Sequence, residues 1–163
     1  MDDNAKTRLI DALKKLDTVM VTTTAENGSM HARPMAIAEI GAGCDLWFVT
    51  AKSSEKLHEV QTDSRAVVTG QGRGRYVSVS GRVDVVVDPA KVRALWKESW
   101  RAWFPEGKTD PSIVLLHLRP EIGEYWDLSG AKGLRHLFEA ARAILDGKRV
   151  QADDPRQHAK VPM

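Results

Sequence analysis

Residues 31–56 read HARPMAIAEIGAGCDLWFVTAKSSEK and predict two neighbouring strands that end in a cationic loop with several hydroxyl groups. Apolar runs separated by a glycine-containing turn are typical of such a pair. Beyond the second strand, Ser53 or Ser54 can cap a following helix, with Lys56 close behind. Together with Arg33 from the first strand, these side chains can bind a phosphate, while strand backbone can bind the edge of an aromatic ring. The segment therefore predicts a site for an aromatic phosphate ester.

Length and composition restrict the class of protein. A chain of 163 residues is typical of one domain, here expected over residues 1–150, followed by a polar tail over 151–163. The net charge of +2 gives no basic footprint for nucleic acid, and no apolar run is long enough to cross a membrane. A single cysteine, Cys44, and five scattered histidines indicate neither a disulfide nor a metal site. We expect a cytoplasmic protein.

Turn signals and short apolar runs predict a fold that is mainly β with α: an antiparallel barrel of six to seven strands with flanking helices. Asn27-Gly28 predicts a hairpin, and Gly81 predicts a bulge in a long strand. The predicted strands cover residues 18–24, 30–39, 46–50, 66–69, 76–87, 112–119 and 121–128, the last two separated by Pro120. The predicted helices cover residues 4–17, 54–61, 89–103 and 133–145.

The order of five segments resembles the pyridoxamine 5′-phosphate oxidase-like flavin-binding split-barrel superfamily, and most closely its general stress protein 26 branch. The segments are ARPM (32–35), LWFVTAKSSEK (46–56), GRYVSVSGRVDVV (74–86), a tryptophan-bearing helix and RPEIGEYWDLSG (119–130). The resemblance implies a split barrel that binds FMN at the interface of a homodimer. The FMN-binding residues that it implies are Arg33, Pro34, Met35, Ala36, Val49, Thr50, Ser53, Ser54, Lys56 and Trp126.

The chain also departs from the pattern of the oxidases. Glu55 stands where they have an arginine between the serine and the lysine, so one phosphate cation is missing and Lys52 is only a possible substitute. Tyr76 stands where they place a glutamine. The segment that holds pyridoxal phosphate in those enzymes has no counterpart in SGAKGLRHL (129–137). We therefore do not expect the oxidation of vitamin B6.

Several of these residues have a structural alternative. Arg33 and Lys56, each taken alone, are better explained as solvated surface charges, but taken together they favour a phosphate site. For the two serines, helix capping and phosphate contact fit equally well. Trp96, Trp100 and Trp103 fall at helical spacing, which favours packing over flavin contact, with a subunit interface as one location for that packing.

Three functions fit the sequence. The first is a flavin-dependent oxidoreductase of unknown substrate, the second a carrier that binds FMN without turnover, and the third a split barrel that binds deazaflavin F420 or haem. No general base, nucleophile or metal cluster can be named from the sequence, so residues alone do not separate the first two. His117 is expected to be a strand residue with a satisfied ring, and Cys44 a partly exposed thiol in a turn.

Overall fold

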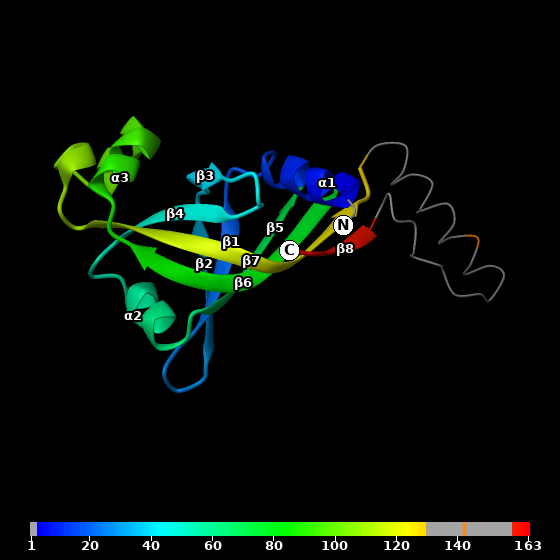
Figure 1. Ribbon diagram of the computed structural model, residues 1–163, viewed down its shortest axis with the longest axis horizontal. Helices are drawn as coiled ribbons and strands as arrows, with labels where there is room; N and C mark the ends of the chain where they lie inside the picture. The colour runs from blue at the N-terminus through cyan, green and yellow to red at the C-terminus, as the bar shows by residue number, and fades with distance from the viewer. Residues whose placement is uncertain (1–2, 130–141, 143–157) are drawn as a thin grey trace.

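A single antiparallel sheet of eight strands forms the body of the protein, which confirms the predicted fold class with a somewhat higher strand count. The computed structural model describes residues 3–129, 142 and 158–163 (Figure 1). The strands are β1 (Val19–Thr24), β2 (Met30–Met35), β3 (Glu39–Ile40), β4 (Leu46–Ala51), β5 (Arg65–Gly72), β6 (Arg75–Val86), β7 (Ile113–Asp127) and β8 (His158–Pro162). The helices are α1 (Asp3–Leu13), α2 (Glu55–Thr62) and α3 (Pro89–Leu95), with the 3₁₀ helices η1 (Glu98–Ala102) and η2 (Gly107–Thr109).

Tight turns connect the strands that are neighbours in sequence. The strand order is β2-β1-β5-β6-β7-β4-β3, and β8 pairs with β7 outside this path. The predicted hairpin at Asn27-Gly28 joins β1 to β2, with Gly28 at a φ of 83°. Arg73 and Gly74, at φ values of 49° and 76°, turn β5 into β6. Two consecutive positive φ values are characteristic of a type I′ hairpin turn, so these two residues form the tight turn between the strands.

The long strand β7 contains a bulge that reverses its inward and outward faces. Its pairing with β6 shifts register next to Gly81, so that Ser80 pairs with Ile122 and Gly81 with Pro120. Before the bulge the even-numbered residues from 114 to 118 enter the core, and after it the odd-numbered residues 123 and 125 do. One extra residue in a strand has this effect because side chains alternate with a period of two. A Cβ at Gly81 would lie 2.0 Å from the Arg119 carbonyl oxygen, so the close approach requires glycine.

The same strand shows why the prediction of two strands separated by Pro120 is wrong. Pro120 has no N–H to donate to a neighbouring strand, but it lies at the bulge, where the strand continues without a hydrogen bond from that residue. The edge of β7 opposite β6 is shared: β4 pairs with residues 113–118 and β8 with residues 122–126. The last residues of the predicted polar tail, His158–Pro162, thus belong to the sheet.

Two hydrophobic clusters lie on opposite faces of the strands that end near α2 and α3. The larger one fills the barrel and includes Leu9, Phe48 and Val79, and α1 packs over it beside β8 (Figure 1). The smaller one includes Trp100, Phe104 and Leu115 and lies beneath α3 and η1. None of the described helices is long and apolar enough to cross a membrane.

Three other local predictions differ from the structure. The strand predicted over 30–39 stops at Met35, because residues 36–38 leave the ladder before β3. The helix predicted over 89–103 ends at Leu95 and resumes as η1, so the three tryptophans do not share one helix face. Cys44 is fully buried, not partly exposed, and burial raises the pKa of its thiol to about 11. The helix predicted over 133–145 lies outside the described residues, apart from Arg142.

The start of α3 offers a direct test of helix capping. The Asp88 carboxylate accepts a hydrogen bond of 2.9 Å from the backbone N–H of Lys91, and Pro89 occupies the first turn. We expect Asp88→Ala to lower the free energy of unfolding by about 1 kcal/mol, because the N–H of Lys91 loses its acceptor. Urea unfolding measures this, with Asp88→Asn, which keeps an acceptor, as the control. Equal destabilisation by both variants would contradict the capping role.

Candidate functional site

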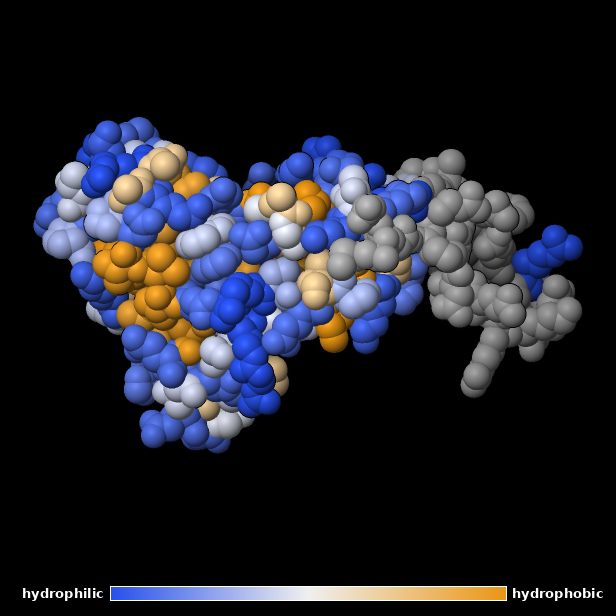
Figure 2. Space-filling view, in the orientation of Figure 1, coloured by the Kyte–Doolittle hydropathy of each residue, from blue (hydrophilic) through white to orange (hydrophobic). Residues whose placement is uncertain are grey.

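One pocket gathers most of the predicted site residues. It lies where β2 and β4 end and α2 begins, beside η1 and the residues that follow it. Its volume of about 380 Å³ is within the range of small-molecule sites. Figure 2 shows hydrophobic side chains gathered between α2 and α3, at this end of the molecule. The lining residues are Pro34, Met35, Ala36, Val49, Thr50, Ala51, Ser54, Lys56, Trp100, Trp103 and Phe104. Of the ten predicted residues, three lie outside this lining: Arg33, Ser53 and Trp126.

A polar group formed by three side chains stands at one side of the pocket. Thr50 lies near the end of β4. Its hydroxyl donates to Ser54 Oγ at 3.1 Å and accepts from Lys56 Nζ at 3.1 Å. Ser54 occupies the N-cap position of α2, but its side chain makes no capping bond. Its hydroxyl is therefore directed to the pocket group. A half-buried ammonium beside two hydroxyls at a helix N-terminus is suited to bind a phosphate.

The ammonium of Lys56 is electrostatically perturbed. Burial, followed by the positive charge of Arg33, lowers the pKa of Lys56, while the negative charge of Glu59 opposes that shift. An anion in the pocket would favour the charged form of Lys56 and so oppose this shift of its pKa. Binding an anion would also relieve the repulsion between Lys56 and Arg33.

Arg33 itself is committed elsewhere. Its guanidinium donates to Glu59 Oε2 at 2.9 Å and Oε1 at 3.2 Å, and to Thr23 Oγ1 at 2.7 Å. The Glu59 carboxylate also accepts from the Thr23 hydroxyl, and His31 Nδ1 lies 2.7 Å from its Oε1. Glu59 is only 5% exposed, so this is a buried ion pair that ties α2 to β1 and β2. In this arrangement Arg33 is paired with Glu59 and does not belong to the pocket lining, so its predicted role in phosphate binding stays a prediction.

Few local signals in the sequence point to Glu59 as part of the site. Leu57 and Val60 are the apolar positions of α2, and a glutamate between them is expected at the margin of the buried face. Its distance of three residues from Lys56 places both on neighbouring positions of the helix surface. That spacing could have indicated that Glu59 lies near Lys56. No signal in the sequence indicates that Arg33, on β2, pairs with Glu59.

The Glu59 cluster predicts a specific dependence of stability on pH. Burial raises the pKa of Glu59, but hydrogen bonds from Arg33, Thr23 and His31 outweigh it and lower the pKa from 4.5 to about 2. Because the folded pKa lies below the unfolded one, the carboxylate contributes stability that is complete above about pH 4.5 and is lost as the pH falls towards 2. We expect the melting temperature of Glu59→Gln to fall less steeply than that of the wild type over this range. Parallel curves for the two proteins would show that Glu59 is not the linked group.

Aromatic side chains form the wall of the pocket opposite α2. Trp100 and Phe104 are buried in the smaller cluster, whereas Trp103 is 72% exposed. Trp96 packs edge to face on Trp100, with ring centroids 5.8 Å apart, and does not line the pocket. Trp96 thus has only the packing role that the sequence favours for these tryptophans. Trp100 has two roles, since it packs in the smaller cluster and also lines the pocket. Sequence periodicity could not separate them, because it assumes one continuous helix.

Trp126 lies far from this pocket within the chain. The pocket end of β7 is at Val114, the partner of Thr50, whereas Trp126 lies near the other end of the 15-residue strand. At about 3.3 Å per residue, such a strand has a contour on the order of 50 Å. The Trp126 ring stacks on His158 of β8, with centroids 5.0 Å apart. Trp126 thus lies apart from the pocket of its own chain.

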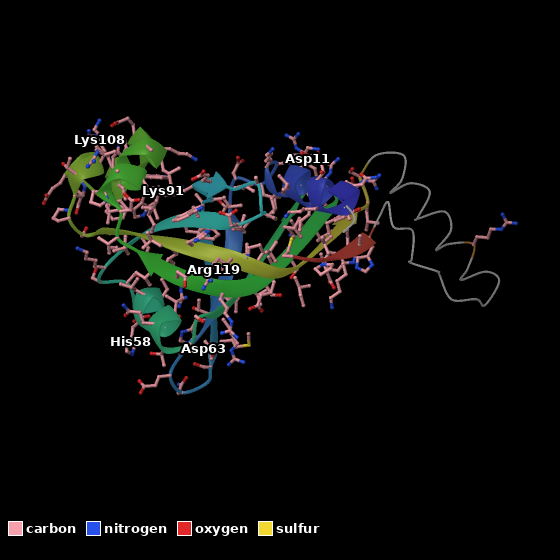
Figure 3. All side chains as sticks on the ribbon, in the orientation of Figure 1. Asp11, His58, Asp63, Lys91, Lys108 and Arg119 are labelled. Carbon is pink, nitrogen blue, oxygen red and sulfur yellow. The ribbon has the colours of Figure 1, made fainter. Side chains whose placement is uncertain are left out.

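A second polar cluster lies on the outer face of β4 and is structural. The Trp47 ring is stacked on His117, with centroids 3.9 Å apart, and Lys91 Nζ lies 4.1 Å from the centre of a Trp47 ring. Asp45 accepts from Trp47 Nε1 at 3.1 Å, and His117 Nε2 is 3.1 Å from the same oxygen. Figure 3 shows Lys91 on α3 above β4, where its ammonium pairs with Glu39 at 2.6 Å. The expected satisfied ring of His117 is confirmed, and the described residues include no group of three side chains that could hold a metal.

Comparisons with known proteins agree with this fold. The family model described as pyridoxamine 5′-phosphate oxidase like matches residues 4–151. General stress protein 26 of Bacillus subtilis is 27% identical over 103 residues, which are 60% of this chain and 71% of that protein. A crystal structure of a candidate general stress protein 26 from Jannaschia sp. CCS1 has a TM-score of 0.73 at 24% identity, covering 98% of this chain and 99% of that one.

A third relative carries a ligand in its description. The general stress FMN/FAD binding protein from Xanthomonas citri is 30% identical, with a TM-score of 0.67, and the match covers 78% of this chain and 92% of that one. The family match covers most of the chain and includes every residue that lines the pocket. This chain belongs to the pyridoxamine 5′-phosphate oxidase-like family.

Proposed function

We propose that this protein binds FMN in the pocket between β2, β4, α2 and η1. The observation that carries the proposal is the juxtaposition, in one pocket, of the Lys56–Thr50–Ser54 group with the strand ends at Pro34–Ala36 and Val49–Ala51. The Lys56–Thr50–Ser54 group suits a phosphate, and the strand ends suit a broad apolar ring with a polar edge. Flavin binding by the Xanthomonas citri relative supports this assignment.

Each part of the chain would have a distinct task. Lys56, Thr50 and Ser54 would hold the phosphate, the backbone of residues 34–36 would face the ring edge, and Trp100 with Phe104 would keep water from the pocket wall. Bound FMN supplies the capacity to accept and donate electrons, which no side chain of the pocket has. Ser53 is exposed and lies outside the lining, so it has no part in this arrangement.

The test of the proposal is direct. The purified protein should show flavin absorbance, or the protein stripped of ligand should quench the fluorescence of added FMN. A colourless protein that fails to quench FMN would refute flavin binding. An absorbance spectrum typical of haem or of a deazaflavin would instead favour the third function considered above.

We also propose that the protein is a homodimer with the flavin between its subunits. Trp126 can reach a bound flavin only from a second subunit, because it lies at the opposite end of β7. Trp103 at the pocket mouth is 72% exposed, and a ring of this size is normally covered. Light scattering of the flavin-loaded protein should give twice the chain mass of 18.1 kDa. A monomer with flavin fully bound would contradict this prediction.

Within flavin binding, we propose an oxidoreductase of unknown substrate in preference to a carrier. The exposed Trp103 lines the pocket, and a second planar molecule could approach the flavin beside it. Anaerobic reduction of the bound flavin by NADH or NADPH, followed by stopped flow, separates the two. Absence of reduction at a useful rate would favour the carrier.

We further propose a cytoplasmic location, with which the single buried thiol is consistent.

A further inference from the structure

The pocket has two cations close by, but only one of them lines it. Lys56 belongs to the lining and contacts Thr50, whereas Arg33, which precedes the lining residue Pro34, does not belong to it. Both Arg33 and Glu59 influence the charge state of Lys56, so the three groups lie within electrostatic range of one another. The two cations therefore differ in their partners, since Arg33 is paired with Glu59 and Lys56 is not.

The partner is a buried carboxylate that Arg33 cannot leave without a penalty. Glu59 accepts two hydrogen bonds from the guanidinium and further ones from Thr23 and His31. Moving Arg33 into the pocket would leave a carboxylate of 5% exposure without its cation. Buried charges are costly once unpaired, so Arg33 stays on Glu59 when a ligand enters.

We infer that Glu59 is a specificity-determining positioning residue: it holds Arg33 outside the pocket and leaves Lys56 as the cation that meets the phosphate of the ligand. The inference rests on the proposed binding of FMN and adds a property that the family assignment does not contain. Arg33, Lys56 and Glu59 together present one net positive charge. Glu59 thereby limits how strongly the site prefers a phosphorylated flavin over riboflavin.

The inference makes opposite predictions for the two members of the ion pair. Glu59→Gln keeps a hydrogen-bond acceptor but removes the charge, so the local net charge rises and the Kd for FMN should fall on the order of tenfold. Arg33→Met removes the cation and leaves the carboxylate, so the Kd for FMN should rise by a similar factor. The double variant restores one net charge, through Lys56, and should bind FMN within about threefold of the wild type.

The double variant is decisive because it distinguishes an indirect from a direct role of Arg33. If Arg33 contacted the phosphate itself, removing Glu59 as well could not restore the lost hydrogen bonds, and the double variant would bind as weakly as Arg33→Met. The double variant also keeps the test usable if Arg33→Met does not fold, since no unpaired charge is left in it. Glu26→Gln removes an exposed carboxylate from the β1–β2 hairpin, outside the pocket lining, and serves as the control; it should change the Kd less than about twofold.

Fluorescence titration of the dimer or monomer as purified, with FMN and with riboflavin, gives all the readouts. Riboflavin affinity should be the same in the wild type and in all four variants, because riboflavin carries no phosphate. A wild type that binds neither flavin would overturn the proposed function and this inference together. Flavin binding with an unchanged or raised Kd for FMN in Glu59→Gln, or with a weak double variant, would overturn the role of Glu59 alone.

Discussion

Lys56→Ala should weaken FMN binding by about 1.5–3 kcal/mol, or roughly 10- to 150-fold in Kd. Lys56 is the cation of the pocket lining, and its ammonium is already aligned on Thr50 at 3.1 Å. The alanine variant loses a charge-assisted hydrogen bond to the phosphate and keeps the pocket walls. Fluorescence titration with FMN measures the change, and titration with riboflavin should show none.

The same loop supplies the control for this variant. Lys52 is exposed and lies outside the pocket, so Lys52→Ala removes an equal charge from a neighbouring position. Its Kd for FMN should stay close to that of the wild type. A strong effect of Lys52→Ala with none of Lys56→Ala would move the phosphate to the exposed side of the loop, where Lys52 would replace the cation that Glu55 displaces.

Arg33→Met should lower the free energy of unfolding by about 3 kcal/mol, the largest single effect on stability that we predict. The variant leaves the Glu59 carboxylate buried against Thr23 and His31 without its cation. The penalty is at the lower end for buried ion pairs, because the Arg33 side chain is 21% exposed and water can approach the vacated side. Urea unfolding monitored by circular dichroism gives the value.

The second partner provides the matched comparison. Arg33→Met combined with Glu59→Gln removes both charges and should recover most of the lost stability, since no unpaired ion is left. Additive losses in the double variant would mean that the two residues act independently. The cluster would then be a set of surface contacts, and Arg33 would be free to contact a ligand.

Local sequence signals located most of the pocket because its residues are consecutive. Pro34–Ala36 and Val49–Ala51 are strand ends, and Ser54 and Lys56 follow one of them directly, so predicting two strands and the start of a helix places them together. The position of Gly81 at a bulge was also predictable, because glycine within a long strand has few other uses. Each of these inferences depends on neighbours in sequence.

The partners of the polar side chains were not predictable in the same way. Arg33 and Glu59 are separated by 26 residues, and only the packing of α2 on β1 and β2 brings them together. The break of α3 at Trp96 and the passage of β7 through Pro120 also depend on tertiary contacts that override local propensity. Trp126 is a further case, since nothing in the sequence around it indicates that it lies at the end of β7 away from the pocket.

The shared edge of β7 divides the sheet into parts that can open separately. The ladder to β4 carries the pocket, and the ladder to β8 begins only beyond Pro120, so the two have no paired residue of β7 in common. Release of β8 would therefore expose the amides on one half of this edge to exchange with solvent and leave the other half protected. The pocket would keep its shape through such local unfolding, and the protein could lose its C-terminal strand transiently without losing its ligand.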